Sequence, residues 1–193
     1  MVWINAPVPG DVVMPDDVDA GYRLTMQLIR CGYRRILFLD HLYHMQPRHH
    51  SRELRLQGYR QAMMEAGLRP MFFTLTPEQL DLDRCACENV WLEKHPEGLD
   101  AIISYDYGQL TLLWHNGGFA GTIRDFAWGT FADHPQPALP GYIMVIPWET
   151  IGREAASMLL HRLEEKREAP IPSSHQQRKI PCRLYHRARQ LPS

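Results

Sequence analysis

Apolar and polar positions follow two different periods along this chain. Short, nearly continuous apolar runs at 35–39, 71–75, 101–104 and 143–146 are typical of the buried strands of a parallel sheet. Between these runs, apolar side chains recur every three or four positions, which is the spacing of one helix face. The alternation of strand and helix predicts βαβ units with right-handed crossovers. We therefore expect an α/β fold, a three-layer parallel sheet with helices on both faces.

Local signals place the ends of several elements. Asp16 or Asp17 can cap the first helix, and Gly32 and Gly67 are natural stops after two helices. Prolines at 7, 9 and 15 predict an extended, loop-like stretch there. The expected strands are 2–6, 35–39, 71–75, 101–104, 124–129, 143–146 and 179–185, and the expected helices are 16 or 17 to about 31, 56–66, 77–95, 110–114 and 148–165.

Composition narrows the class of protein. The 193 residues and 22.5 kDa predict one domain, or at most two small ones. Lys and Arg number 21 and Asp and Glu 22, and this balance argues against a protein that binds a phosphate backbone. No apolar run reaches the roughly 20 residues of a membrane span, and the first residues have no signal-peptide pattern. We expect a cytoplasmic protein that needs no membrane and has reduced cysteines.

Candidate chemistry lies where predicted strands end, because ligands of open parallel sheets bind outside the carboxyl ends of the strands. Arg55 begins a helix near this edge, with Ser51 one turn before it, and its guanidinium suits a polyol, sugar or carboxylate. Two structural alternatives remain open: the aspartates cap helices, and Arg55 pairs with a neighbouring acid. The residues just past the predicted strands are Asn5, Asp40, Asp106 and the pair Thr130–Phe131.

Metal and cofactor motifs are missing from the sequence. His41, His44, His49 and His50 are close together, but they occupy a predicted loop rather than the rigid elements that hold metal ligands. The chain has no Gly-x-Ser-x-Gly, no His-Glu-x-x-His and no glycine loop that cradles phosphate. We therefore expect neither a metal nor a cofactor.

Five stretches, in order along the chain, carry a further signal. They are Asp16-Asp17 with Leu28 to Ile36, Ser51 to Leu68, Leu99 to Ile103, Pro147 to Leu160, and Pro181 to Arg187. The second reads S-x-x-x-R-x-x-G-Y-x-x-A-x-x-x-A-G-L, and the fourth reads P-x-x-x-I-G-x-x-A-A-x-x-L-L. Together they resemble the effector-binding domain of LacI/GalR-type transcriptional regulators.

The resemblance implies the C-terminal part of a type I periplasmic-binding-protein-like domain. In these terms, residues 1–14 are a remnant of the first lobe and hinge crossing, and 130–147 is a crossing segment toward the missing first lobe. Residues 15–129 and 148–193 form the C-terminal effector-binding lobe. The headpiece that binds DNA is absent from this chain, which looks like a fragment or a truncated gene product.

The implied function is effector sensing and dimerisation without chemistry, so we expect no enzyme. The partner is a small, sugar-like effector, and the implied contacts are Asn5, Ser51, Arg55, Asp106 and Phe131. Phe131 stands where the family has a ligand-binding Asp, which predicts an effector that is less polar, aromatic or absent. The resemblance also implies a symmetric homodimer, with Leu110, Leu112, Leu113 and Trp114 at its interface.

Two other functions stay open from the sequence. A small flavodoxin-like or receiver-like protein would use Asp40 and Asp106 to hold Mg²⁺ for phosphoryl transfer. A shared ion would require their oxygens within about 4–5 Å of each other. Alternatively, the chain is a dimerisation element with no ligand.

Overall fold

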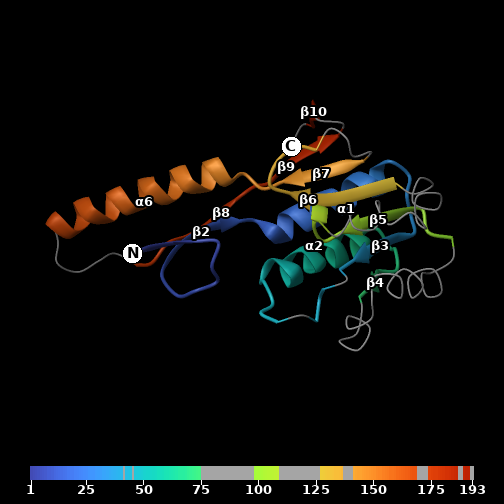
Figure 1. The fold of residues 1–193 in the computed structure, drawn as a ribbon, viewed down its shortest axis with the longest axis horizontal. Coiled ribbons are helices and arrows are strands. Elements are labelled where there is room, and N and C mark those ends of the chain that lie inside the picture. The colour runs from blue at the N-terminus through green and yellow to red at the C-terminus, as the bar shows by residue number, and fades with distance from the viewer. Residues whose placement is uncertain are drawn as a thin grey trace.

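The computed structural model arranges the chain around two sheets (Figure 1). The N-terminus lies at the smaller sheet and the C-terminus at the larger one (Figure 1). The described residues are 1–40, 42–44, 46–74, 98–108, 127–136, 141–168, 174–186 and 189–191. No helix among them is long and apolar enough to cross a membrane.

The larger sheet has the strand order β10-β9-β7-β6-β5-β3-β4. Strands β4, β3, β5, β6 and β7 are parallel, and β9 pairs antiparallel with β7. This arrangement confirms the predicted α/β class with parallel strands. The strands are β3 Ile36–Leu39, β4 Met71–Phe73, β5 Ala101–Ser104, β6 Ala127–Ala132, β7 Tyr142–Val145, β9 Arg183–His186 and β10 Arg189–Gln190.

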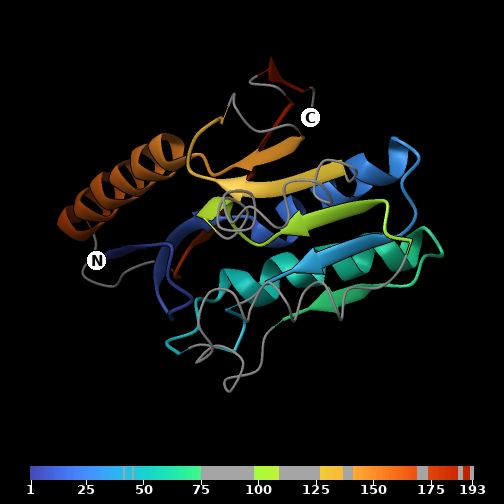
Figure 2. The ribbon, with the colours of Figure 1, turned by 45° about the vertical axis from the view of Figure 1, so that its right-hand side comes forward.

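Two helices, α1 (Asp17–Arg30) and α2 (Ser51–Glu65), lie side by side against one face of this sheet (Figure 2). Their apolar side chains join those of the strands in one buried cluster, and a second cluster lies on the other face. The helices expected at 77–95 and 110–114 lie outside the described residues.

Capping fixes the ends of α1 as the sequence predicts. The Asp16 carboxylate accepts a hydrogen bond from the Asp19 N–H at 3.3 Å, and Gly32 follows the helix with φ +98°. Helix α2 begins at Ser51, five residues before the first expected position, because its first three residues, Ser51 to Glu53, are polar and carry no apolar periodicity. It ends as expected before Gly67, at φ +68°.

Glycines let α1 and α2 touch backbone to backbone. A Cβ at Gly21 would lie 2.2 Å from the carbonyl oxygen of Arg55, and one at Gly58 would lie 2.0 Å from that of Val18. Only glycine fits at such distances. This contact carries Arg55 to the start of α1, where Asp17 lies.

The smaller sheet consists of β1 (Val2–Ile4), β2 (Asp11–Pro15) and β8 (Gln177–Ile180), all parallel. Strand β2 is fully buried, so the loop expected at 7–15 is wrong over its second half. The prolines do not interrupt it, because Pro15 occupies its last position.

Each of the two sheets draws on separate parts of the chain. Helix α6 (Trp148–Glu168) packs against β1 and β2, and β8 pairs with β2, so both elements lie with the first residues of the chain. Strand β7 falls inside the expected crossing segment 130–147, yet it is an interior strand of the larger sheet. The signal for α6 was correct, but sequence proximity to β7 does not reveal which sheet the helix covers.

Candidate functional site

A hollow of about 320 Å³ opens at the carboxyl ends of β5 and β6. Three of the five predicted effector contacts, Arg55, Asp106 and Phe131, line it together. They arrive from α2, from the residues after β5 and from β6. The other lining residues are Tyr107, Gly108, Ala132, Asp133, His134, Gln136 and Ile146.

Arg55 is held by a buried ion pair. Its Nε donates to the Asp17 carboxylate at 2.8 Å, and its Nη1 donates to the Tyr105 carbonyl at 3.0 Å. The guanidinium carbon lies 4.5 Å from the centre of the Phe131 ring. Nη2 makes no hydrogen bond to a described residue. The alternative that Arg55 pairs with a neighbouring acid is thus confirmed. The acid is Asp17, whose negative charge balances the positive charge of Arg55.

Phe131 changes the character of the hollow. Its ring is 1% exposed and stacks on the Arg55 guanidinium. The floor of the hollow is therefore aromatic, and no acid at this position competes with Asp17 for Arg55.

Acceptors stand on the rim of the hollow. Asp106 lies beyond β5, and Asp133 accepts a hydrogen bond from the Trp148 indole at 2.7 Å. Sequence reasoning missed Asp133, His134 and Gln136 because it ended the strand at 129. The strand runs to Ala132, so an expected strand three residues longer would have placed all three just past its carboxyl end, where ligand contacts are expected.

Ser51 and Asn5 lie away from the hollow. The Ser51 hydroxyl is buried between the Tyr105 hydroxyl, 2.8 Å away, and His49 Nδ1, 2.7 Å away, so it holds Tyr105 in place. Asn5 follows β1 with φ +51°, and its N–H donates to the Val13 carbonyl at 2.9 Å. Neither residue lines the hollow among the described part of the chain.

The Asp40 carboxylate is engaged by neighbouring residues. It forms an ion pair with Arg52 and accepts a hydrogen bond from the Leu42 N–H at 3.2 Å. Leu42 lies in a turn, and the next described helix, α2, begins only at Ser51, so the contacts of Asp40 are not the helix cap that was an alternative for this residue. Within the described ranges, no three His, Cys, Asp or Glu side chains come together in a way that could hold a metal.

The histidines near α2 pack against each other rather than around a shared centre. The rings of His49 and His50 lie 4.3 Å apart, and burial lowers the pKa of both imidazoles. Their neutral forms are thereby favoured beside Arg55. His41, also singled out in the sequence, lies outside the described residues.

Solved structures share this fold at low sequence identity. The cellobiose complex of the transcriptional regulator CelR superposes with a TM-score of 0.65 and 21% identity, over 97% of this chain and 58% of that one. A putative LacI-family regulator from Rhizobium etli gives 0.70 and 20%, over 98% and 68%. A ribose-bound LacI-family regulator from Enterococcus faecium gives 0.68 and 14%, over 98% and 68%. The chain thus spans less than two thirds of the first of these.

Sequence comparison identifies the family directly. No curated protein shows significant similarity to this chain. A family profile, described as periplasmic binding proteins and sugar binding domain of LacI family, matches residues 3–106. The match covers more than half of the chain, including most of β1, all of β2 to β5, and Arg55. The chain therefore belongs to the family of periplasmic binding proteins and LacI-type sugar-binding domains.

Proposed function

We propose that the hollow binds the small-molecule effector of a transcriptional regulator and performs no chemistry on it. The observation that carries the proposal is the meeting of Arg55, Asp106 and Phe131 at the carboxyl ends of the sheet. Support comes from the sugar-binding family and from relatives solved with cellobiose and ribose. Nothing supports the magnesium-dependent phosphoryl-transfer alternative, whose Asp40 is paired with Arg52.

The chemistry of the hollow favours a neutral, hydroxylated ligand with an apolar face. Asp17 already matches the charge of Arg55, so Arg55 offers a donor for a hydroxyl rather than a free cation for an anion. Asp106 and Asp133 supply acceptors for hydroxyl groups. Phe131, Ala132 and Ile146, all largely buried, form the apolar floor beneath them. A neutral sugar satisfies all three conditions. The phosphate group of a sugar phosphate would instead be repelled by the carboxylates of Asp106 and Asp133.

The experiment is an NMR titration of the isotope-labelled chain with ribose, cellobiose and glucose 6-phosphate. We expect millimolar binding, because one open side of the hollow leaves much of a ligand exposed. The shifts of Gly108, Ala132 and Asp133 should change with the neutral sugars only. Asp106→Ala should reduce these changes, while the control Glu149→Ala, on the exposed side of α6, should not. Equal responses in both variants, or none with any sugar, would refute the proposal.

We also propose that the protein acts in the cytoplasm as a homodimer and reaches DNA through a headpiece that this chain does not contain. The expected interface residues Leu110, Leu112, Leu113 and Trp114 lie outside the described residues, so the interface remains a prediction from the sequence. Sedimentation equilibrium tests it. A monomer at micromolar concentrations would contradict the homodimer, and a dimer unchanged by Leu110→Glu with Leu112→Glu would place the interface elsewhere.

A further inference from the structure

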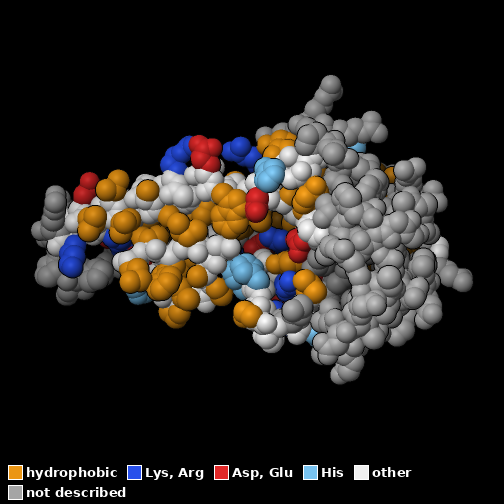
Figure 3. Space-filling model, viewed as in Figure 1, with side chains coloured by type: hydrophobic (Ala, Val, Ile, Leu, Met, Phe, Trp, Pro, Cys, Tyr) orange, Lys and Arg blue, Asp and Glu red, His pale blue; other side chains and the backbone are white. Residues whose placement is uncertain are grey.

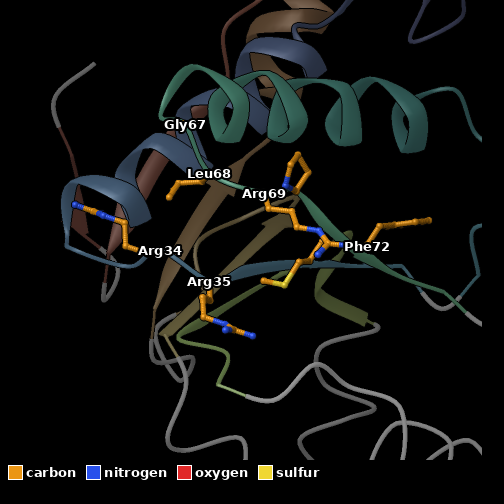
Figure 4. A pocket seen from close by; sticks show the side chains of 8 residues that line it. Arg34, Arg35, Gly67, Leu68, Arg69 and Phe72 are labelled. Atoms are coloured by element: carbon orange, nitrogen blue, oxygen red, sulfur yellow. The ribbon is translucent and has the colours of Figure 1, made fainter.

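Two features of the molecule take no part in the effector hollow. Hydrophobic side chains gather along the arm formed by α6 and the smaller sheet (Figure 3), and a hollow of about 630 Å³ lies at the amino ends of β3 and β4 (Figure 4). The side chains of Arg34, Arg35 and Arg69 point in different directions around that hollow, so they do not converge on one ligand. The arm, in contrast, presents an apolar surface together with an open strand edge.

Strand β1 forms this open edge, because β2 is its only partner strand in the described part of the chain. Ile4 lies opposite Val13, and the Val13 carbonyl accepts the N–H of Asn5 at 2.9 Å. Successive residues of a strand direct their N–H and C=O groups to opposite sides. The N–H and C=O groups of Val2 and Ile4 therefore point away from β2, toward the open edge.

Apolar side chains adjoin this edge on both elements of the arm. Trp3 and Ile4 of β1, and Leu159 and Leu163 of α6, are each between 42% and 51% exposed. The two leucines lie one helical turn apart, so they form a stripe along α6.

The leucine stripe lies on the flank of α6 that faces the open edge. Helix α6 packs over β1 and β2, and Glu154 on its other flank forms an ion pair with Arg178 of β8 at 2.8 Å. Strands β8 and β1 are the two opposite edges of the smaller sheet. The flank that carries Leu159 and Leu163 is therefore the one toward β1.

We infer that this edge of the arm binds a second copy of the chain, with the two β1 strands antiparallel about a two-fold axis perpendicular to the sheet. When the pairing is centred on Trp3, Val2 lies opposite Ile4 of the second copy. Each such pair exchanges N–H···O bonds in both directions, so the outward groups of both copies find partners. The two Trp3 residues then form a pair without backbone hydrogen bonds, where side chains approach most closely.

The spacing of the helices fits this assembly. The two-fold axis lies half a strand spacing outside β1, and α6 lies over β1 and β2, so α6 is about one strand spacing of 4.8 Å from the axis. The axis therefore places α6 and its copy antiparallel and about 9–10 Å apart. Packed helices lie about 8–10 Å apart.

The facing flanks of the two helices are also complementary in size and charge. In one antiparallel alignment each leucine meets a small residue, and a carboxylate meets an ammonium group near each helix end. Gly152 has open space around it, which leaves room for a leucine side chain. The facing pairs of this alignment are Leu163 with Gly152, Leu159 with Ala156, and Glu149 with Lys166.

Disulfide trapping tests the strand pairing on the intact chain. Trp3→Cys sets two thiols opposite each other at a Cα separation of about 4.5 Å, which a disulfide spans. We expect mild oxidation to give a dimer in which mass spectrometry finds the peptide with position 3 linked to its own copy. The matched control is Ser157→Cys, an exposed position on the other flank of α6, which should give no such link.

Sedimentation equilibrium tests the helix contact. Leu163→Glu should weaken self-association at least about tenfold, because it places a charge in the apolar contact with Gly152 of the second copy. Ser157→Glu adds the same charge on the opposite flank and should leave self-association unchanged. Leu110→Glu with Leu112→Glu concerns the separate interface expected at 110–114, so it should leave the disulfide at position 3 in place.

Three results would overturn the inference. A natural chain that is monomeric at tens of micromolar would show that the β1 edge binds no second copy. Equal dimer yields from Trp3→Cys and Ser157→Cys would show chance collision instead of strand pairing. Equal self-association of Leu163→Glu and Ser157→Glu would show that the leucine stripe takes no part.

Discussion

Replacing Arg55 with methionine should cost the folded chain about 3–5 kcal/mol, the usual penalty for removing one partner of a buried ion pair. The side chains of Arg55 and Asp17 are only 6% and 1% exposed and meet at 2.8 Å. The other Asp17 oxygen has no partner among the described residues. The Asp17 carboxylate would therefore be left buried and without a hydrogen bond to the described part of the chain.

A double-mutant cycle separates this electrostatic cost from lost packing. If the uncompensated charge dominates, Asp17→Leu combined with Arg55→Met should be more stable than Arg55→Met alone, because no buried charge remains. As a control, Arg153→Met breaks the exposed pair with Glu149 and should cost less than about 0.5 kcal/mol.

Urea unfolding followed by circular dichroism measures the unchanged chain, the single variants Asp17→Leu and Arg55→Met, the double variant and the control Arg153→Met. A loss below about 1 kcal/mol for Arg55→Met would show that water or another group satisfies Asp17. Strictly additive losses in the double variant would show that the two side chains do not interact energetically, and would refute the reasoning.

Three further predictions follow from burial and packing. Gly58→Ala should prevent folding or cost several kcal/mol, because its Cβ would lie 2.0 Å from the backbone of the opposite helix. Gly152 has open space around it, so Gly152→Ala should stabilise α6 by up to about 1 kcal/mol. Thermal unfolding measures both effects. Burial raises the pKa of the Cys182 thiol to about 12, so iodoacetamide in mildly alkaline buffer should modify it only after denaturation. Mass spectrometry of the peptide that contains Cys182 measures the modification. Rapid labelling of the folded chain would contradict the prediction. The hydrogen bond from Arg162 lowers the pKa of Asp11, so the folded chain binds fewer protons than the unfolded one. The stability this provides is present above the unfolded pKa and lost as the pH falls through the folded pKa, and in acid-dependent urea unfolding Asp11→Asn should show a weaker pH dependence.

The elements that could be predicted from the sequence are those with local signals. Strand β5 has the expected bounds, and α1 begins and ends where Asp16 and Gly32 indicate. Strand β2 could not be predicted, because its burial depends on pairing with residues 177–180 near the other end of the chain. The expected strand at 179–185 is two strands for a similar reason: Pro181 and Cys182 carry the chain from one sheet to the other.

The candidate site was predictable to the extent that strand ends were. Arg55, Asp106 and Phe131 meet because β5 and β6 are parallel neighbours, and although the pattern predicted parallel strands, it did not predict this strand order. Asn5 also follows a strand, but that strand belongs to the smaller sheet, and no local pattern distinguishes the two sheets. Asp17 carried a visible capping signal, yet its pairing with Arg55 depends on the close approach of α1 and α2.

An apolar face runs along the elongated arm formed by α6 and the smaller sheet (Figure 3). Only the fold brings its residues together, because they come from segments far apart in the sequence. Trp3 is 43% exposed and Leu160 62% exposed on these elements. Ile143 to Ile146, in contrast, are buried within the larger sheet and its edge.

The pairing of β2 with β8 has a consequence for the order of folding. Val12 lies opposite Gln177, so the central strand of the smaller sheet gains its second neighbour only when nearly the whole chain has been synthesised. Closing so long a loop lowers the conformational entropy of the chain before the new contacts stabilise it. Pairings of this kind therefore form slowly. The larger sheet, with β3, β4 and β5 close in sequence, can form first. During synthesis one edge of β2 therefore stays unpaired until β8 is made. A chain that stops before β8 leaves this edge free to pair with a strand of another molecule.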